Sequence, residues 1–149
     1  MAESTHYTFH AVLHARPADA PSGPTIALRG LSLSTLAVRP EDSAEGFAVS
    51  FEEFETYCAT AARMFFEPDG SFVWRSGADE APWQLDGLVA DRDGRVRFID
   101  LKGNCPPERL EWLLAPLGWP RQSILFQLAQ EAVFLDEATF RRYAAAEAT

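Results

Sequence analysis

Hydrophobic and polar residues alternate with a period of two close to the start of the chain. Successive side chains of a strand point to opposite faces of a sheet, so this pattern predicts a half-buried strand. The apolar side of the pattern is formed by Tyr7, Phe9, Ala11 and Leu13, and the polar side includes the three histidines of the sequence, His6, His10 and His14.

The three histidines lie four residues apart, a spacing that would make them neighbours on a helix. On the predicted strand, His6 and His10 are about 13 Å apart at roughly 3.3 Å per residue, which is too far to share one zinc ion. The histidine spacing therefore does not indicate a metal site.

Residues 25–38, with the sequence TIALRGLSLSTLAV, have the composition of a second strand. Ile26 and Leu28 are in phase with each other. Leu31 and Leu33 are also in phase with each other, but one residue out of step with the first pair. An extra residue in a strand produces such a shift, so a bulge is predicted at Gly30.

A helix is predicted to begin after Ser50. Ser50 and Glu53 have the spacing of a capping box, in which each side chain accepts a hydrogen bond from the backbone N–H of the other residue. Apolar residues then recur at helical spacing, and the helix is expected to end near Met64. The buried face of this helix comprises Phe51, Phe54, Cys58, Ala61 and Phe65.

Two further helices have clear start signals. Pro106 and Pro107 suit the first turn of a helix that ends at Gly118, since glycine favours the position just beyond a helix. Asp136 is predicted to cap the last helix. The inward residues are Leu110, Leu113, Leu114 and Leu117 on the second helix, and Phe140, Tyr143 and Ala144 on the third.

Strands account for the remaining patterned segments. A turn at 67–70 precedes a short aromatic strand at 71–75, and residues 83–103 have the pattern of a hairpin around the turn sequence DRDG. Residues 123–135 are too apolar to show a period and are predicted to form one or two buried strands. The resulting order is β-β-α-β-β-β-α-β-α. It predicts an α+β fold with a largely antiparallel sheet and about three helices.

Composition is that of one globular domain spanning residues 1–149. Hydrophobic residues make up 47% of the chain and aromatic residues 12%, enough for a core of ordinary size. No segment approaches the roughly 20 apolar residues of a membrane helix, and the start, MAESTHYTFH, lacks the pattern of a secretion signal. We therefore expect a soluble, cytoplasmic protein.

The two cysteines, Cys58 and Cys105, are too few for a disulfide framework and lack the neighbours of a zinc site. Cys105 stands just before a predicted helix, where a thiolate is favoured and could be reactive. No histidine lies near it in sequence to act as a base. Two reduced, unreactive thiols are the favoured interpretation.

The net charge of -9 and the isoelectric point of about 4.7 bear on possible partners. An acidic protein repels the phosphate backbone of nucleic acids and attracts basic protein surfaces. Charge alone therefore favours a protein partner, possibly a basic one, over sequence-independent binding of nucleic acid.

Candidate chemistry is confined to the hairpin at 83–103, which carries Asp86, Asp100 and Lys102. A two-residue turn at 93–94 would place Asp86 opposite Leu101. A type I turn with a bulge at Gly94 would instead place Asp86 opposite Asp100, and this register is favoured because it also pairs apolar residues with each other. Carboxylates facing each other destabilise a sheet unless something compensates for their repulsion.

A divalent metal would provide that compensation, because hard cations such as Mg²⁺ and Mn²⁺ take oxygen ligands. Asp86 and Asp100 are accordingly the candidate metal ligands. Lys102, two residues beyond Asp100 on the same strand, could stabilise a developing oxyanion or orient a water molecule.

These residues resemble the motif of the PD-(D/E)xK nucleases. The match consists of Asp86 in LDG and of Asp100 and Lys102 in IDLKG, although Leu85 stands where that motif often has proline. The predicted order from residue 50 to 128 (helix, three strands, helix, strand) also resembles that family's core. The resemblance implies a metal-dependent nuclease with catalytic Asp86, Asp100 and Lys102, to which a first-helix glutamate, Glu52 or Glu55, could add a ligand.

Three functions remain open from the sequence. The leading hypothesis is a non-catalytic binding module for a protein partner, and the alternative is a metal-dependent nuclease or phosphodiesterase of the PD-(D/E)xK type. A third possibility is a small-molecule binder with a cleft lined by Trp74 and Trp83. The charges of the hairpin could also have no role beyond solvation at the end of a sheet.

Overall fold

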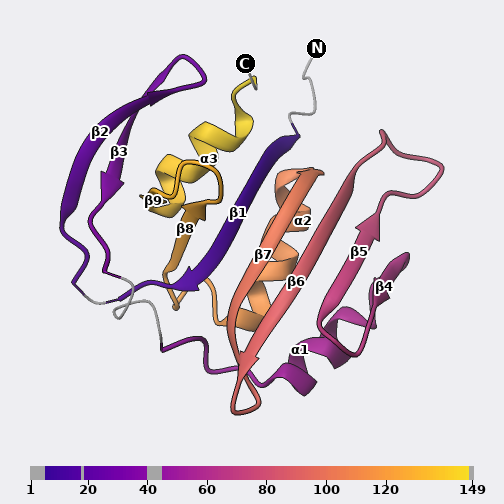
Figure 1. Ribbon diagram of the computed structural model, residues 1–149. Coiled ribbons are helices and arrows are strands. Elements are labelled where there is room, and N and C mark those ends of the chain that lie inside the picture. Colours follow the sequence, from indigo (N-terminus) through magenta and orange to yellow (C-terminus); the bar gives the residue numbers. More distant parts are fainter. Residues whose placement is uncertain (1–5, 18, 40–44, 148–149) are drawn as a thin grey trace.

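One nine-stranded antiparallel sheet and three α-helices make up the part of the chain that the computed structural model describes, residues 6–17, 19–39 and 45–147. The strands follow the order β2-β3-β9-β8-β1-β7-β6-β5-β4 (Figure 1). Their bounds are β1 Tyr7–Ala15, β2 Ser22–Leu28, β3 Leu31–Leu36, β4 Met64–Phe66, β5 Ser71–Arg75, β6 Gln84–Arg92, β7 Arg95–Cys105, β8 Ile124–Leu128 and β9 Phe134–Leu135.

The helices are α1 (Phe51–Cys58), α2 (Pro107–Leu114) and α3 (Glu137–Ala145), and a short 3-10 turn, Ala115–Leu117, follows α2. This is the predicted α+β fold, with each helix at the predicted place among the strands. The predicted caps are also present. Ser50 and Glu53 form the capping box of α1, Asp136 accepts a hydrogen bond from the Thr139 N–H, and Gly118 is left-handed with φ 100°.

The predicted second strand is a hairpin of two strands. Arg29 and Gly30 have φ 52° and 73°, and this pair of left-handed residues reverses the chain so that Leu28 lies opposite Leu31. The apparent phase shift has the same origin, because residues paired across a two-residue turn share a face. The predicted bulge at Gly30 is therefore wrong, and the residue belongs to a turn.

The first helix is shorter than predicted. It ends at Cys58, and Arg63 is left-handed with φ 59°, so the helical pattern cannot continue to Met64. Met64–Phe66 forms the edge strand β4 instead, paired with β5. As a consequence, Phe65 is 50% exposed instead of lying on the buried face of a helix.

All three helices lie against the same face of the sheet. The odd-numbered residues of β1 point to this face, where Phe9 contacts Phe140 of α3 edge to face at 5.1 Å between ring centroids. Phe54 of α1 contacts Phe66 of β4 on that side as well. Figure 1 shows α1 and α2 behind β4–β7, and α3 between β1 and the β2–β3 hairpin. Among the described residues, the opposite face of the sheet carries no helix.

Two junctions connect the helices to one another. Tyr57 of α1 donates a hydrogen bond to the Trp112 carbonyl of α2 at 2.7 Å, and the two rings lie 4.2 Å apart. Arg141 of α3 connects to the other side of α2 through the carboxylate of Glu111 at 2.9 Å. The helix layer therefore forms a continuous row, α1-α2-α3.

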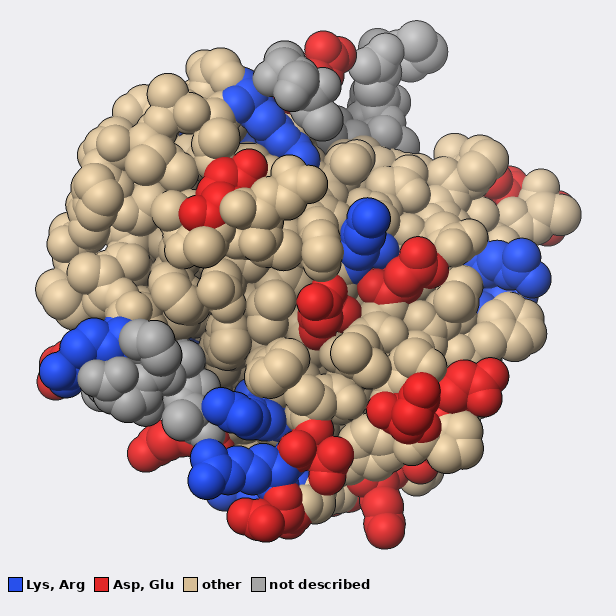
Figure 2. All heavy atoms as spheres, viewed as in Figure 1, with Lys and Arg blue, Asp and Glu red and all other residues tan. Residues whose placement is uncertain are grey.

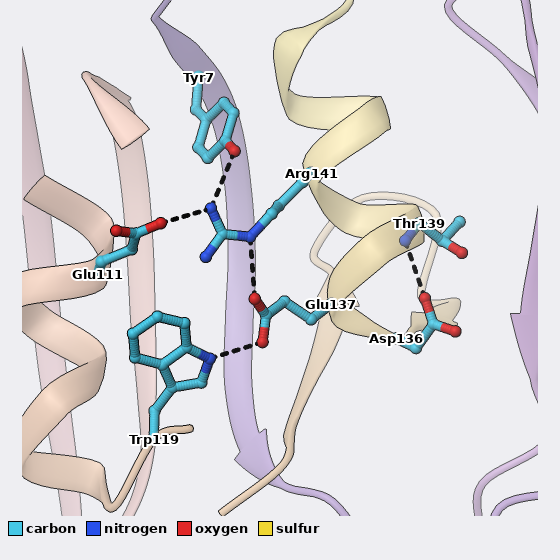
Figure 3. Close-up of polar contacts among 7 residues, drawn as sticks. All are labelled: Tyr7, Glu111, Trp119, Asp136, Glu137, Thr139 and Arg141. Atoms are coloured by element: carbon cyan, nitrogen blue, oxygen red, sulfur yellow. Dashed lines mark hydrogen bonds and ion pairs between the residues drawn. The ribbon is translucent and has the colours of Figure 1, made fainter. Parts of the chain in front are cut away.

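The Arg141 junction also reaches the sheet and the segment after α2 (Figure 3). Its guanidinium binds Glu137 at 2.9 Å within α3, and it donates to the hydroxyl of Tyr7 on β1 at 3.2 Å. Glu137 in turn accepts from the indole N–H of Trp119 at 2.6 Å. The Arg141 side chain is only 22% exposed, so these contacts are partly shielded from solvent.

We expect Arg141→Met to lower the free energy of unfolding by about 1–3 kcal/mol, because it leaves two carboxylates without their shared cation. Arg142→Met is the matched control, since this neighbouring side chain is exposed, and its effect should stay within about 0.5 kcal/mol. Urea denaturation of both variants measures the difference. Equal effects of the two substitutions would show that the junction contributes nothing specific.

Candidate functional site

The turn between β6 and β7 consists of two residues, Asp93 and Gly94. Both are left-handed, with φ 54° and 82°, as a type I′ turn requires. Arg92 therefore pairs with Arg95. The sequence favours a type I turn with a bulge at Gly94, and that prediction is wrong.

A bulge then shifts the register of the hairpin. Asp91 pairs with Val96 and Ala90 with Phe98, so Arg97 has no partner of its own. Beyond this bulge Asp86 lies opposite Lys102, and Leu88 lies opposite Asp100. The predicted pairing of Asp86 with Asp100 is wrong, because sequence reasoning placed the extra residue in the turn and not three residues after it.

Asp86, Asp100 and Lys102 nevertheless share the helix-free face of the sheet. Paired residues of neighbouring strands point the same way, and so do residues two apart on one strand. Asp86 and Asp100 are thus diagonal neighbours, roughly 7–8 Å apart by ordinary sheet geometry. Figure 2 shows acidic and basic side chains side by side over the region of β6 and β7.

A fourth polar residue joins this group from β1. His10 pairs with Lys102 across the sheet, and its Nε2 lies 2.9 Å from Oδ1 of Asp100. Both side chains are a little more than one third exposed. The alternation of residues in β1 predicts that His10 lies on the polar side of its strand. It does not predict that β1 pairs with β7, because His10 and Asp100 are 90 residues apart in the sequence.

Both carboxylates contact other side chains of the same protein. Asp100 contacts His10, and Asp86 accepts a hydrogen bond from the side-chain amide of Gln84 at 2.9 Å. No cluster of three or more His, Cys, Asp or Glu side chains suited to hold a metal ion occurs among the described residues. Glu52 and Glu55 belong to α1, on the other side of the sheet, so neither adds a ligand to Asp86.

His14 lies on the same face and is buried. Its Nε2 donates to the side-chain oxygen of Gln127 at 3.0 Å, whereas the buried Nδ1 has no hydrogen-bond partner among the described residues. The rings of Phe98 and Phe134 lie about it at 5.8 and 6.0 Å. Burial lowers the pKa of His14 below its usual value, and the positive charge of Arg97 adds to this effect.

Exposed apolar side chains also occur on the helix-free face. Phe65 on β4 is 50% exposed and Leu88 on β6 is 46% exposed, and they are the two exposed large hydrophobic side chains among the described residues. Val73 of β5 pairs with Phe65 on one side and with Asp86 on the other, so it shares their face. These three residues, Phe65, Val73 and Leu88, are called the apolar patch below.

The remaining sequence candidates are buried. Burial raises the pKa of Cys105 to about 12. The thiol therefore stays protonated, and the reactive thiolate that its position before α2 suggested is not favoured. Trp74 and Trp83 belong to the core and contact each other edge to face at 5.1 Å. The cavity beside them measures about 150 Å³, well below the roughly 300 Å³ at which small-molecule sites begin.

Comparison with protein families, curated proteins and solved structures finds no match to this chain. No helix in the described ranges has the length and apolar character that crossing a membrane requires.

The buried His14 should make stability depend on pH. An unfolded histidine titrates near pH 6.5, and the folded one titrates lower, so the unfolded state binds the proton first as pH falls. We expect the free energy of unfolding to decrease below about pH 6.5 and the decrease to level off below the folded pKa. His14→Gln should reduce this decrease. Denaturation curves at several pH values measure it, and equal pH profiles of wild type and His14→Gln would contradict the assignment.

Proposed function

We propose that this protein is a non-catalytic interaction module that binds a protein partner through the apolar patch. The observation that carries the proposal is the placement of Phe65 and Leu88, which are exposed on the same helix-free face of the sheet. Burying such side chains is favourable at about 25 cal/mol per Å² of apolar surface. A partner that covers this face would therefore gain most of its binding energy from the patch.

The charges around the patch support a basic partner. Glu67 follows β4, Asp86 lies next to Val73, and Asp100 lies opposite Leu88. Two cations are also near: Arg75, whose guanidinium lies 5.3 Å from the centre of the Phe65 ring, and Lys102, which lies opposite Asp86. Figure 2 also shows several acidic side chains over the region of α1 and β4. A partner with basic side chains around an apolar centre complements this arrangement.

The test compares a patch variant with a control on the same face. The double variant Phe65→Ser/Leu88→Ser should bind a partner recovered with the wild-type protein at least about tenfold more weakly, because both anchors are removed. Leu36→Ser, on β3 at the far end of that face, should bind as the wild type does. Binding of the purified partner is measured by calorimetry, and the melting temperature of each variant establishes that it is folded.

The salt dependence of binding tests whether the partner is basic. Contacts between exposed charges are screened over about 8 Å at physiological ionic strength, so binding of a basic partner should weaken as salt rises. A partner that binds the double variant as tightly as the wild type would refute the proposal. Association of two copies of the chain through the patch, seen by sedimentation, would refute the proposed class of partner.

A second candidate function, metal-dependent phosphodiester cleavage, is favoured by one observation. The bulge at Arg97 brings Asp86 to the face that carries Asp100 and Lys102, where the two-residue turn alone would have separated them. Two carboxylates and a lysine on one open face match the PD-(D/E)xK motif in residue type. Each carboxylate contacts a neighbouring side chain through one oxygen, Asp86 with Gln84 and Asp100 with His10, which leaves its second oxygen for Mg²⁺ or Mn²⁺.

If this second candidate holds, Mn²⁺ should support cleavage of DNA or RNA by the purified protein, and Asp86→Ala, Asp100→Ala and Lys102→Ala should each abolish it. Mn²⁺ should also raise the melting temperature of the wild type but not of Asp100→Asn. Asp91→Ala, on the same strand beyond the bulge, is the matched control and should keep full activity. Cleavage that persists in all three alanine variants would identify a contaminant, and no metal effect on either readout would refute the candidate.

A further inference from the structure

A cavity of about 450 Å³ lies where the sheet opens beside β1. β8 pairs with β1 only from Ala11 to Ala15, whereas β7 pairs with β1 from Tyr7 onward. The first residues of β1 therefore have no β8 partner. The turn between β2 and β3 lies beside them instead, with Arg29 bonded to the Thr8 carbonyl. The cavity is lined by strand, turn and helix residues, among them Thr8, His10, Arg29, Lys102, Asn104 and Tyr143.

Arg29 is held in this cavity by backbone carbonyls. Its Nη1 donates to the carbonyls of Thr8 at 2.8 Å, Tyr143 at 2.9 Å and Ala146 at 3.4 Å. The guanidinium also lies 3.9 Å from the centre of the Tyr143 ring. Within the described ranges no carboxylate forms an ion pair with Arg29, so its charge is positioned but not neutralised. The Arg29 side chain also hydrogen-bonds the Tyr143 side chain, and the remaining N–H groups of the guanidinium can donate to a ligand.

Lys102 brings a second cation to the same cavity. It is the only lysine of the sequence, beside twelve arginines. Its side chain is exposed, and no ion pair involving it occurs in the part of the chain that the structure describes. Glu131 is the one carboxylate among the described lining residues, and Asp86 and Asp100 lie next to Lys102 on the sheet without lining the cavity.

We propose that this cavity binds the phosphate monoester of a small organic molecule. A phosphate monoester carries nearly two negative charges at neutral pH and so matches Arg29 and Lys102 together, whereas a simple carboxylate matches only one of them. Thr8, Asn104 and Gln130 supply further hydrogen-bonding groups. The volume lies within the usual range of small-molecule sites, about 300–1,000 Å³, so the cavity has room for the organic part of the ligand beside the phosphate.

The single lysine makes a direct test possible. Reductive methylation with isotopically labelled methyl groups labels Lys102 and the N-terminal amine alone, and NMR then reports on the Lys102 ammonium. Adenosine monophosphate is the probe, adenosine is its uncharged counterpart, and inorganic phosphate tests the charged group by itself. We expect the monophosphate and phosphate to shift the Lys102 signal and adenosine to leave it unchanged.

Calorimetry on the unmodified protein gives the affinities. Lys102→Gln should weaken binding of adenosine monophosphate by about tenfold or more, since a charge-assisted hydrogen bond is lost. Arg121→Gln, an exposed cation outside the cavity, should leave the affinity unchanged. The patch variant Phe65→Ser/Leu88→Ser should also bind normally, which separates this cavity from the proposed protein-binding face. Equal binding by wild type and Lys102→Gln, equal binding of adenosine, or no response to the monophosphate and phosphate at millimolar concentration would overturn the proposal.

Discussion

The pairing of β1 with two strands that come much later in the chain is the constraint on which the rest of this structure depends. On one side β1 pairs with β7, and on the other it pairs with β8. The strands β2, β3, β9 and β8 lie to one side of it, and β7, β6, β5 and β4 lie to the other. Without β1, the described sheet would separate into two smaller sheets. The Arg141 junction strengthens the same seam, because it connects α3, α2 and Tyr7 of β1.

The features that the sequence predicted well are the local ones. The capping box of α1, the Asp136 cap of α3 and the stop at Gly118 each depend on residues a few positions apart, and all are present. The alternation of Tyr7, Phe9, Ala11 and Leu13 likewise identified the buried side of β1. Such patterns are visible because capping and amphipathic burial impose fixed spacings along the chain.

The features that the sequence could not predict depend on distant partners. Because of the bulge at Arg97, Asp86 pairs with Lys102 and not with Asp100 as the sequence predicts. The residues next to Arg97 in the sequence give no sign of a bulge. Val96 is held from outside the hairpin, since it donates to the Val49 carbonyl and accepts from Phe47 N–H. His10 was likewise placed on the correct face, but its contact with Asp100 crosses 90 residues. The sequence therefore predicts which residues form the candidate site. It does not predict how they are arranged, because that depends on how distant strands pair in the sheet.

The central place of β1 also has a consequence for how the chain acquires its structure. β1 is synthesised before both of the strands that flank it, and its partners on β7 and β8 follow after about 90 and 110 residues of chain. Closing such long loops costs entropy before any contact compensates for it, so folding should be slow compared with that of a helical protein of this size. Phe9 and Leu13, which are buried in the fold, cannot reach their native surroundings before these partners are present. The apolar side of β1 is therefore the part of the sheet that waits longest in synthesis for the strands that flank it.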